Sequence, residues 1–192
     1  MHRIKLSMNT IIGLFGMMCS GKDTVADYLS SLGYRKLSMS EDVLKPILLR
    51  LKLKPDRVNY IKLGKVLKEF KKDILAFMIH GLINKGEGHK FVIPNIMTFE
   101  EARFLKSQKD IRFLLFKVSA EQNVRYERNL QRKSEKDVVE LSRFKKLDMW
   151  NLTRTGLKEL MHASMEDAEI INNTSLEELH KKINELVKKY EL

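Results

Sequence analysis

The chain has 192 residues, of which 32% are charged, and its formal net charge is +11. This length allows one medium-sized domain with a substantial core and excludes two large domains. No apolar run approaches the roughly 20 residues that span a bilayer, and a single cysteine excludes an intrachain disulfide bond.

The positive charge favours polyanionic ligands, such as nucleotides, RNA, DNA or anionic lipid. Because the lysines are spread over predicted helices and are not interleaved with aromatic residues, a solvated surface is favoured over a nucleic-acid groove. A basic start, a short apolar run and Ser20 resemble a secretory signal. We reject that alternative because Gly13 and Gly16 break the run, and we expect a cytoplasmic protein that binds no membrane.

A glycine-bounded turn near the N-terminus is the most specific pattern. An apolar run at 10–15 predicts a buried strand, and apolar spacing over 22–32 predicts a helix. Between them runs Gly16-Met17-Met18-Cys19-Ser20-Gly21-Lys22-Asp23-Thr24, a G-x-x-x-x-G-K match. Glycines permit the tight turn, and inward backbone amides with the helix dipole form an anion site. Lys22 adds a cation that reaches the outer phosphates of a nucleotide, so this turn predicts a phosphate-binding loop.

The rest of the chain alternates between strands and helices. We expect further strands at 34–37, 91–93, 113–118 and 168–171, and helices at 41–51, 55–70, 73–83, 98–106, 120–132, 138–152, 156–165 and 175–190, with loops at 84–90 and 133–137. Gly33 is a helix C-cap candidate, and capping boxes are expected at Ser38–Glu41 and Thr98–Glu101. In the helix at 55–70 we expect one inner side, formed by Val58, Ile61, Leu63, Val66, Leu67 and Phe70.

This alternation predicts an α/β protein with three layers, α/β/α, around a mostly parallel five-stranded sheet. Ligands of such sheets bind beyond the carboxyl ends of the strands.

The loop resembles that of nucleoside monophosphate and deoxynucleotide kinases, in which a residue without a hydroxyl group often precedes the final threonine. Further segments follow the order seen in archaeal-type P-loop proteins related to adenylate, cytidylate and dephospho-coenzyme A kinases. They are Asp42-Val43-Leu44-Lys45, 91–101, 120–137, 144–148 and 168–173. The resemblance implies one P-loop kinase-like domain over 1–192, with a core at 8–40, 88–124 and 153–192, an acceptor-binding helical segment at about 41–87 and a lid at about 125–152.

The resemblance also implies roles for single residues. Residues 16–24 would hold ATP, with Lys22 on the β- and γ-phosphates and with Thr24 and Asp23 supporting Mg²⁺. Arg125, Arg128 and Arg132 share one helix face and are candidate lid cations, although a solvated basic face is the alternative.

Two candidates lie outside the loop and the lid. Asp42 could orient or deprotonate the acceptor, or only complement a helix dipole. Asn172 and Asn173 follow the last strand and could contact the base, or only form a turn.

Three departures from the related proteins leave alternatives open. Pro94 and Asn95 replace Asp-Gly at the place of a Walker B carboxylate, and Met97 and Lys45 replace arginines. Either catalysis is weak, or a carboxylate such as Asp23 supports the metal, or the protein binds nucleotide without turnover.

The leading hypothesis is an ATP-dependent enzyme that phosphorylates a small molecule, namely a nucleoside monophosphate or a nucleotide-like metabolite. The alternatives are dephospho-coenzyme A kinase-like activity, a non-catalytic nucleotide-binding protein and a nucleic-acid-binding protein. A monomer and a homodimer both stay open.

Overall fold

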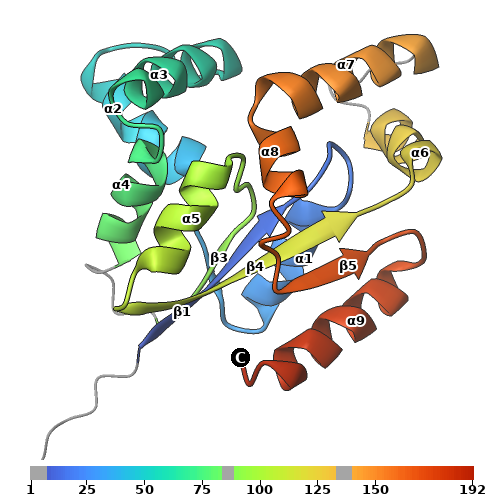
Figure 1. Ribbon diagram of the computed structural model, residues 1–192. Coiled ribbons are helices and arrows are strands. Elements are labelled where there is room, and N and C mark those ends of the chain that lie inside the picture. Colours follow the sequence, from blue (N-terminus) through green and yellow to red (C-terminus); the bar gives the residue numbers. More distant parts are fainter. Residues whose placement is uncertain (1–7, 84–88, 133–139) are drawn as a thin grey trace, which may run out of the picture.

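A parallel sheet forms the centre of the computed structural model, which describes residues 8–83, 89–132 and 140–192. Within these residues five strands pair in the order β2-β3-β1-β4-β5, and every neighbouring pair is parallel. They are β1 (Asn9–Phe15), β2 (Arg35–Lys36), β3 (Lys90–Ile93), β4 (Ile111–Ser119) and β5 (Ala168–Ile171). Because β1 is central, the chain that follows it emerges at the middle of the carboxyl edge (Figure 1).

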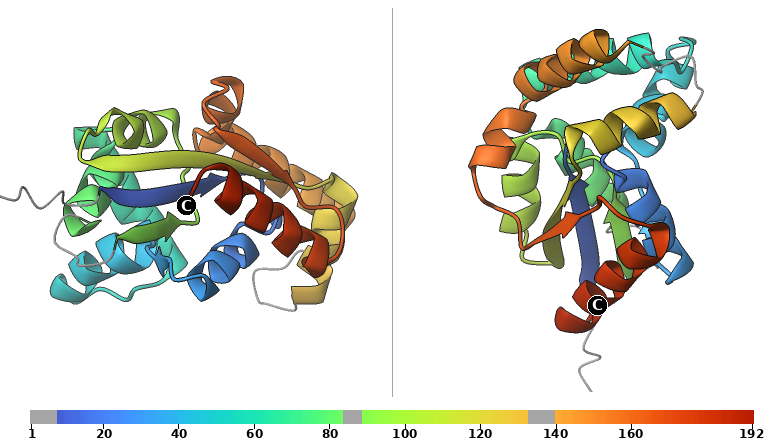
Figure 2. Two further views of the ribbon diagram at one scale, coloured as in Figure 1. Left: turned by 90° about the horizontal axis from the view of Figure 1, so that it is seen from below. Right: turned by 90° about the vertical axis from the view of Figure 1, so that its right-hand side faces the viewer.

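Alternate residues of the central strands point into two separate cores. Ile11 and Phe15 of β1 pack in one core, and Ile12 and Leu14 pack in the other. The helices that supply buried residues to the second core are α1 (Lys22–Ser31) and α9 (Leu176–Lys189). The first core receives buried residues from α4 (Ile74–Ile83), α5 (Phe99–Ser107), α8 (Leu157–His162) and the π-helical turn η1 (Met39–Leu44). Helices therefore cover both faces of the sheet (Figure 2), which confirms the expected three-layer α/β/α fold.

The connection from β2 to β3 begins with two short helices where the sequence predicts one helix. A π-helical turn, η1 (Met39–Leu44), leads directly into α2 (Lys45–Arg50). Pro46 explains the change, because it has no N–H to donate to the carbonyl of Asp42 in a continuous α-helix. Its place in the first turn of α2 needs no such bond.

The next helix, α3 (Arg57–Phe70), buries a narrower face than expected. Four of the six residues expected on its inner side are exposed, namely Val58, Ile61, Val66 and Phe70. Leu63 and Leu67 do pack on the core, together with Tyr60. The expected set spanned more than one helix face, whereas α3 packs mainly on α4 and η1 (Figure 1).

The helix starts show one complete capping box and one altered one. The hydroxyl of Thr98 accepts from the Glu101 N–H, and the Glu101 carboxylate accepts from the Thr98 N–H, as the sequence predicts. At η1, Ser38 accepts from the Glu41 N–H at 3.3 Å, but Asp42 Oδ2 rather than Glu41 accepts from the Ser38 N–H, at 2.6 Å. The exposed Glu41 carboxylate instead pairs with Lys45 at 2.8 Å.

The second half of the chain adds α6 (Gln122–Arg132) and α7 (Leu141–Arg154) beyond the carboxyl end of β4 (Figure 1). The expected 133–137 loop and most of the expected 84–90 loop lie outside the described residues. None of the helices in the described part of the chain is long and apolar enough to cross a membrane.

Glu101 is the strongest candidate for a single side chain on which local stability depends. It is fully buried, its Oε1 lies 2.8 Å from Lys68 Nζ, and its Oε2 accepts from the N–H groups of Met97 and Thr98. We expect Glu101→Ala to lower the free energy of unfolding by about 2–3 kcal/mol, because it removes a helix cap and one partner of a largely buried ion pair. Urea denaturation followed by circular dichroism measures this loss.

Glu100→Ala is the matched control, because Glu100 lies 3.5 Å from the exposed Lys72. That contact is worth less than about 1 kcal/mol. Equal losses in the two variants would contradict the assigned role of Glu101.

Candidate active site

The loop between β1 and α1 has a backbone that only glycine can follow at two positions. Gly16 has a φ of +144°, and a Cβ atom there would lie 2.1 Å from the Val118 carbonyl oxygen. Gly21 has a φ of +99°, and its Cβ would lie 2.2 Å from Nδ2 of Asn172. Both positions combine a left-handed conformation with close approach of neighbouring chain. The loop therefore packs closely against the ends of β4 and β5.

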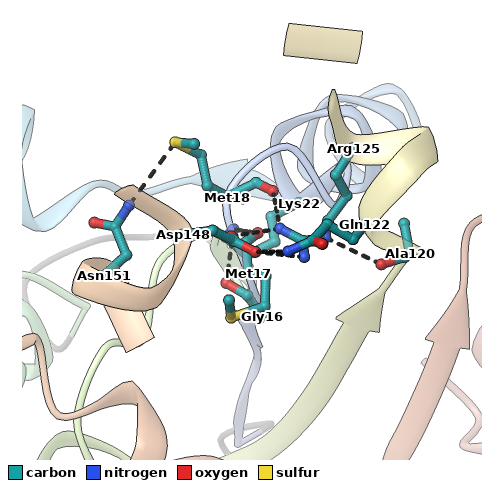
Figure 3. Close-up of polar contacts among 9 residues, drawn as sticks. All are labelled: Gly16, Met17, Met18, Lys22, Ala120, Gln122, Arg125, Asp148 and Asn151. Carbon is teal, nitrogen blue, oxygen red and sulfur yellow. Dashed lines mark hydrogen bonds and ion pairs between the residues drawn. The ribbon is translucent and has the colours of Figure 1, made fainter. Parts of the chain in front are cut away.

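Lys22 begins α1 and folds back over the loop. Its ammonium group donates to the carbonyl oxygens of Gly16 at 3.0 Å and Met17 at 2.9 Å (Figure 3). Burial lowers the pKa of Lys22 to about 8, against the opposing effect of the neighbouring Asp23. Lys22 is thus still mainly protonated at neutral pH, and desolvation makes its charge available to an anion.

An open pocket of about 440 Å³ lies between this loop and α6. Its lining comprises Cys19, Gly21, Lys22, Asp23, Thr24, Arg128, Gln131 and Arg132. Three of these side chains are cationic, Lys22 from the loop and two arginines from α6. The structure therefore brings together the predicted phosphate loop and two of the three predicted lid arginines.

The third arginine differs from the expectation of a cation that faces phosphate. Arg125 is buried, and its guanidinium makes two hydrogen bonds to the carboxylate of Asp148, at 2.5 and 2.7 Å (Figure 3). It also donates to the carbonyl oxygens of Ala120 and Met18. The sequence could not reveal this, because Asp148 lies 23 residues away on α7. Arg125 links α6, α7 and the loop through a neutralised ion pair.

The two asparagines that follow β5 make different contacts. Asn173 Oδ1 accepts from the Glu121 N–H at 2.8 Å, and its Nδ2 donates to the Glu121 carboxylate, so this side chain joins the turn to the start of α6. Asn172 is 4% exposed and donates to the carbonyl of Ser20 at 2.9 Å. Asn173 is therefore held against the start of α6, and Asn172 reaches the loop, while contact of either side chain with a base stays a prediction.

Asp42 does not line the loop pocket, because its carboxylate caps η1 at Ser38. A second hollow of about 130 Å³ lies beside η1 and the end of β3. It is lined by Ser38, Met39, Ser40, Leu44, Lys68, Leu75, Pro94, Asn95, Met97 and Glu101. The fold thus has a second hollow next to η1, and the acceptor candidates Asp42 and Lys45 are not among its lining residues.

The end of β3 has no carboxylate at the Walker B place. Asn95 is exposed there, and the following residue, Ile96, donates its N–H to the Leu14 carbonyl at 2.9 Å. Over residues 8–83, 89–132 and 140–192 no three His, Cys, Asp or Glu side chains are grouped to hold a metal ion. Asp23, which is 71% exposed, and Thr24 line the loop pocket and remain the residues with suitable oxygen atoms.

Comparison with known proteins agrees with this geometry. A family model described as an AAA domain matches residues 12–170. A UPF0200 protein of Sulfurisphaera tokodaii is 26% identical over 188 residues, which are 96% of this chain and 99% of that protein.

Two solved structures share the fold at low sequence identity. The shikimate kinase of Acinetobacter baumannii has a TM-score of 0.60 at 15% identity, with 97% of each chain covered. The dephospho-CoA kinase of Campylobacter jejuni has a TM-score of 0.55 at 14% identity, with 94% of this chain and 96% of that chain covered. The chain therefore belongs to the AAA domain family, and it has the same fold as these two kinases.

Proposed function

We propose that this protein transfers a phosphoryl group from ATP to a small-molecule acceptor. The observation that supports the proposal most is the convergence of Lys22, Arg128 and Arg132 on one pocket beside the loop. Phosphoryl transfer asks a protein chiefly for positioning and for neutralisation of the charge on the phosphoryl oxygens. A glycine-bounded loop with one cation of its own and two more from α6 meets that requirement.

The loop also fits a polyphosphate in its details. Gly21 leaves no space for a side chain, so the backbone itself borders the pocket. The Arg128 Nη1 atom is buried and has no hydrogen-bond partner within the described residues. A buried unpaired donor is costly, and an anionic oxygen would satisfy it. Mg²⁺, held through Thr24 with support from Asp23, would neutralise further phosphate charge.

The acceptor would occupy the hollow beside η1. Its cation, Lys68, is paired with Glu101, and its remaining polar side chains, Ser38, Ser40 and Asn95, are uncharged. Nucleoside monophosphates and dephospho-coenzyme A are the first acceptors to test, because the related kinases act on such molecules.

A non-catalytic nucleotide-binding protein is the second candidate. The observation that favours it is Asn95, an amide where related kinases place a metal-supporting carboxylate. Both candidate functions use the same nucleotide-binding loop, and they differ only in whether the bound nucleotide is turned over.

The first test is a coupled assay for ADP formation with each acceptor. We expect turnover by the wild-type protein and a loss of at least about 10²-fold in kcat/KM for Lys22→Met, which removes the loop cation while keeping much of its length. Lys188→Met, an exposed lysine at the end of α9, is the control and should match wild type. ATP binding without turnover of any acceptor would favour the second candidate.

The pH dependence of nucleotide affinity follows from the pKa of Lys22. A bound phosphate favours the ammonium form of Lys22. The affinity for ATP should therefore be highest below the Lys22 pKa of about 8 and should fall as the pH rises above it. Calorimetric titration with ATP from about pH 6.5 to about pH 9.5 measures this fall. Lys22→Arg, which does not titrate in this range, should give a flat profile. An equal fall in both proteins would contradict the assignment.

The metal requirement distinguishes the roles of Asp23 and Thr24. Mg²⁺ should raise the ATP affinity of the wild-type protein. We expect Thr24→Val to make this gain about tenfold smaller, because it removes a hydroxyl ligand while keeping the volume of the side chain. Asp23→Asn should reduce it less, since an exposed carboxylate 3.6 Å from Lys36 acts in a high dielectric. Titration of Mg²⁺ at fixed ATP gives both values. A larger effect at Asp23 would make that carboxylate the substitute for the missing one after β3.

A further inference from the structure

One buried amide connects the phosphate loop with a lid arginine. Asn172 follows β5, and its backbone N–H donates to the Ser119 carbonyl at 2.8 Å, which fixes it to the end of β4. Its side-chain Nδ2 donates to the Ser20 carbonyl at 2.9 Å, and its Oδ1 accepts from Arg128 Nη2 at 3.1 Å. A single side chain thus contacts the loop on one side and α6 on the other.

These contacts determine the direction of the Arg128 guanidinium. With Nη2 held by Asn172, the other terminal nitrogen, Nη1, is buried and has no partner in the described part of the chain. Nη1 also lies 4.0 Å from the position that a Cβ on Gly21 would take. The unpaired donor is therefore at the loop, where the phosphate chain of a nucleotide would lie.

The neighbouring arginine shows why an amide matters here. Arg125 is held by the Asp148 carboxylate, which cancels its charge. Arg128 is held by an uncharged oxygen, so it is oriented and still carries its full charge. The two arginines lie three residues apart on α6 and differ in the group that holds them.

We infer that Asn172 is a positioning residue, which couples the loop to Arg128 and orients this guanidinium toward the bound phosphates without neutralising it. The inference rests on the phosphate-binding part of the proposed function and is independent of turnover.

A double-mutant cycle measured by binding tests the inference. The variants are Asn172→Ala, Arg128→Ala and the double substitution, and the probe is Mg²⁺-tripolyphosphate, which has no base or ribose. We expect each single substitution to raise the dissociation constant about tenfold, as for loss of a hydrogen bond to a charged group. The double variant should bind no more than about threefold more weakly than the weaker single variant, because Asn172 acts through Arg128.

Two further variants separate positioning from packing. Asn172→Asp keeps the shape but places a carboxylate beside Arg128, so it should weaken tripolyphosphate binding at least as much as Asn172→Ala. If Asn172→Ala does not fold, Asn172→Ser takes its place in the cycle. Asn184→Ala, whose exposed amide contacts only the Tyr28 hydroxyl in the described chain, is the control and should bind as wild type does.

The outcomes are distinguishable. Additive effects of Asn172→Ala and Arg128→Ala, or wild-type affinity in Asn172→Asp, would overturn the inference. Absence of tripolyphosphate binding to the wild-type protein would overturn it as well. Non-additive binding effects in a protein that transfers no phosphoryl group would support the inference and remove only the proposed catalysis.

Discussion

The close contact of one loop with the ends of two strands is the constraint on which the site depends. At Gly16 a Cβ atom would lie 2.1 Å from the Val118 carbonyl oxygen, which leaves no space for a side chain. At Gly21 the neighbour is the amide of Asn172. A loop confined in this way keeps its amides and the start of α1 in one arrangement, and that arrangement has to exist before any anion arrives. The position of β1 in the centre of the sheet also contributes to the site. It places the loop where side chains from both halves of the carboxyl edge can reach it.

Three cations beside this loop are held by three different kinds of partner. Lys22 is desolvated and donates to two backbone carbonyls, and the neighbouring Asp23 offsets the effect of burial on its pKa only in part. Arg125 is cancelled by Asp148 and holds α6, α7 and the Met18 carbonyl together. Arg128 is oriented by an amide. The net charge of +11 is a sum over the whole sequence, and a count of charges would not have separated these three cases.

The helices between β2 and β3 show how local pattern and tertiary packing compete. The apolar residues of α3 are spread around the helix, and only the side against η1 and α4 is buried, which leaves Phe70 85% exposed. At η1 the capping motif is kept at Ser38, but Asp42 replaces Glu41 as the reciprocal acceptor. In the wider π-helical turn the residue four positions along lies over the cap, whereas the motif assumes a regular α-helix. At α5, where the helix is regular, the same motif is complete.

The sequence by itself determined the elements whose causes are local. Glycine spacing predicted the loop, apolar runs predicted the five strands, helical apolar spacing predicted most helices, and Thr98-x-x-Glu101 predicted the start of α5. Only the tertiary structure decided which polar groups meet. Arg125 pairs with Asp148, Lys68 with Glu101, and the Asn172 amide with the Ser20 backbone carbonyl, across 23, 33 and 152 residues of chain. Local sequence patterns carry no information about such pairs, because their members come from separate elements that only the packing of helices on the parallel sheet brings together.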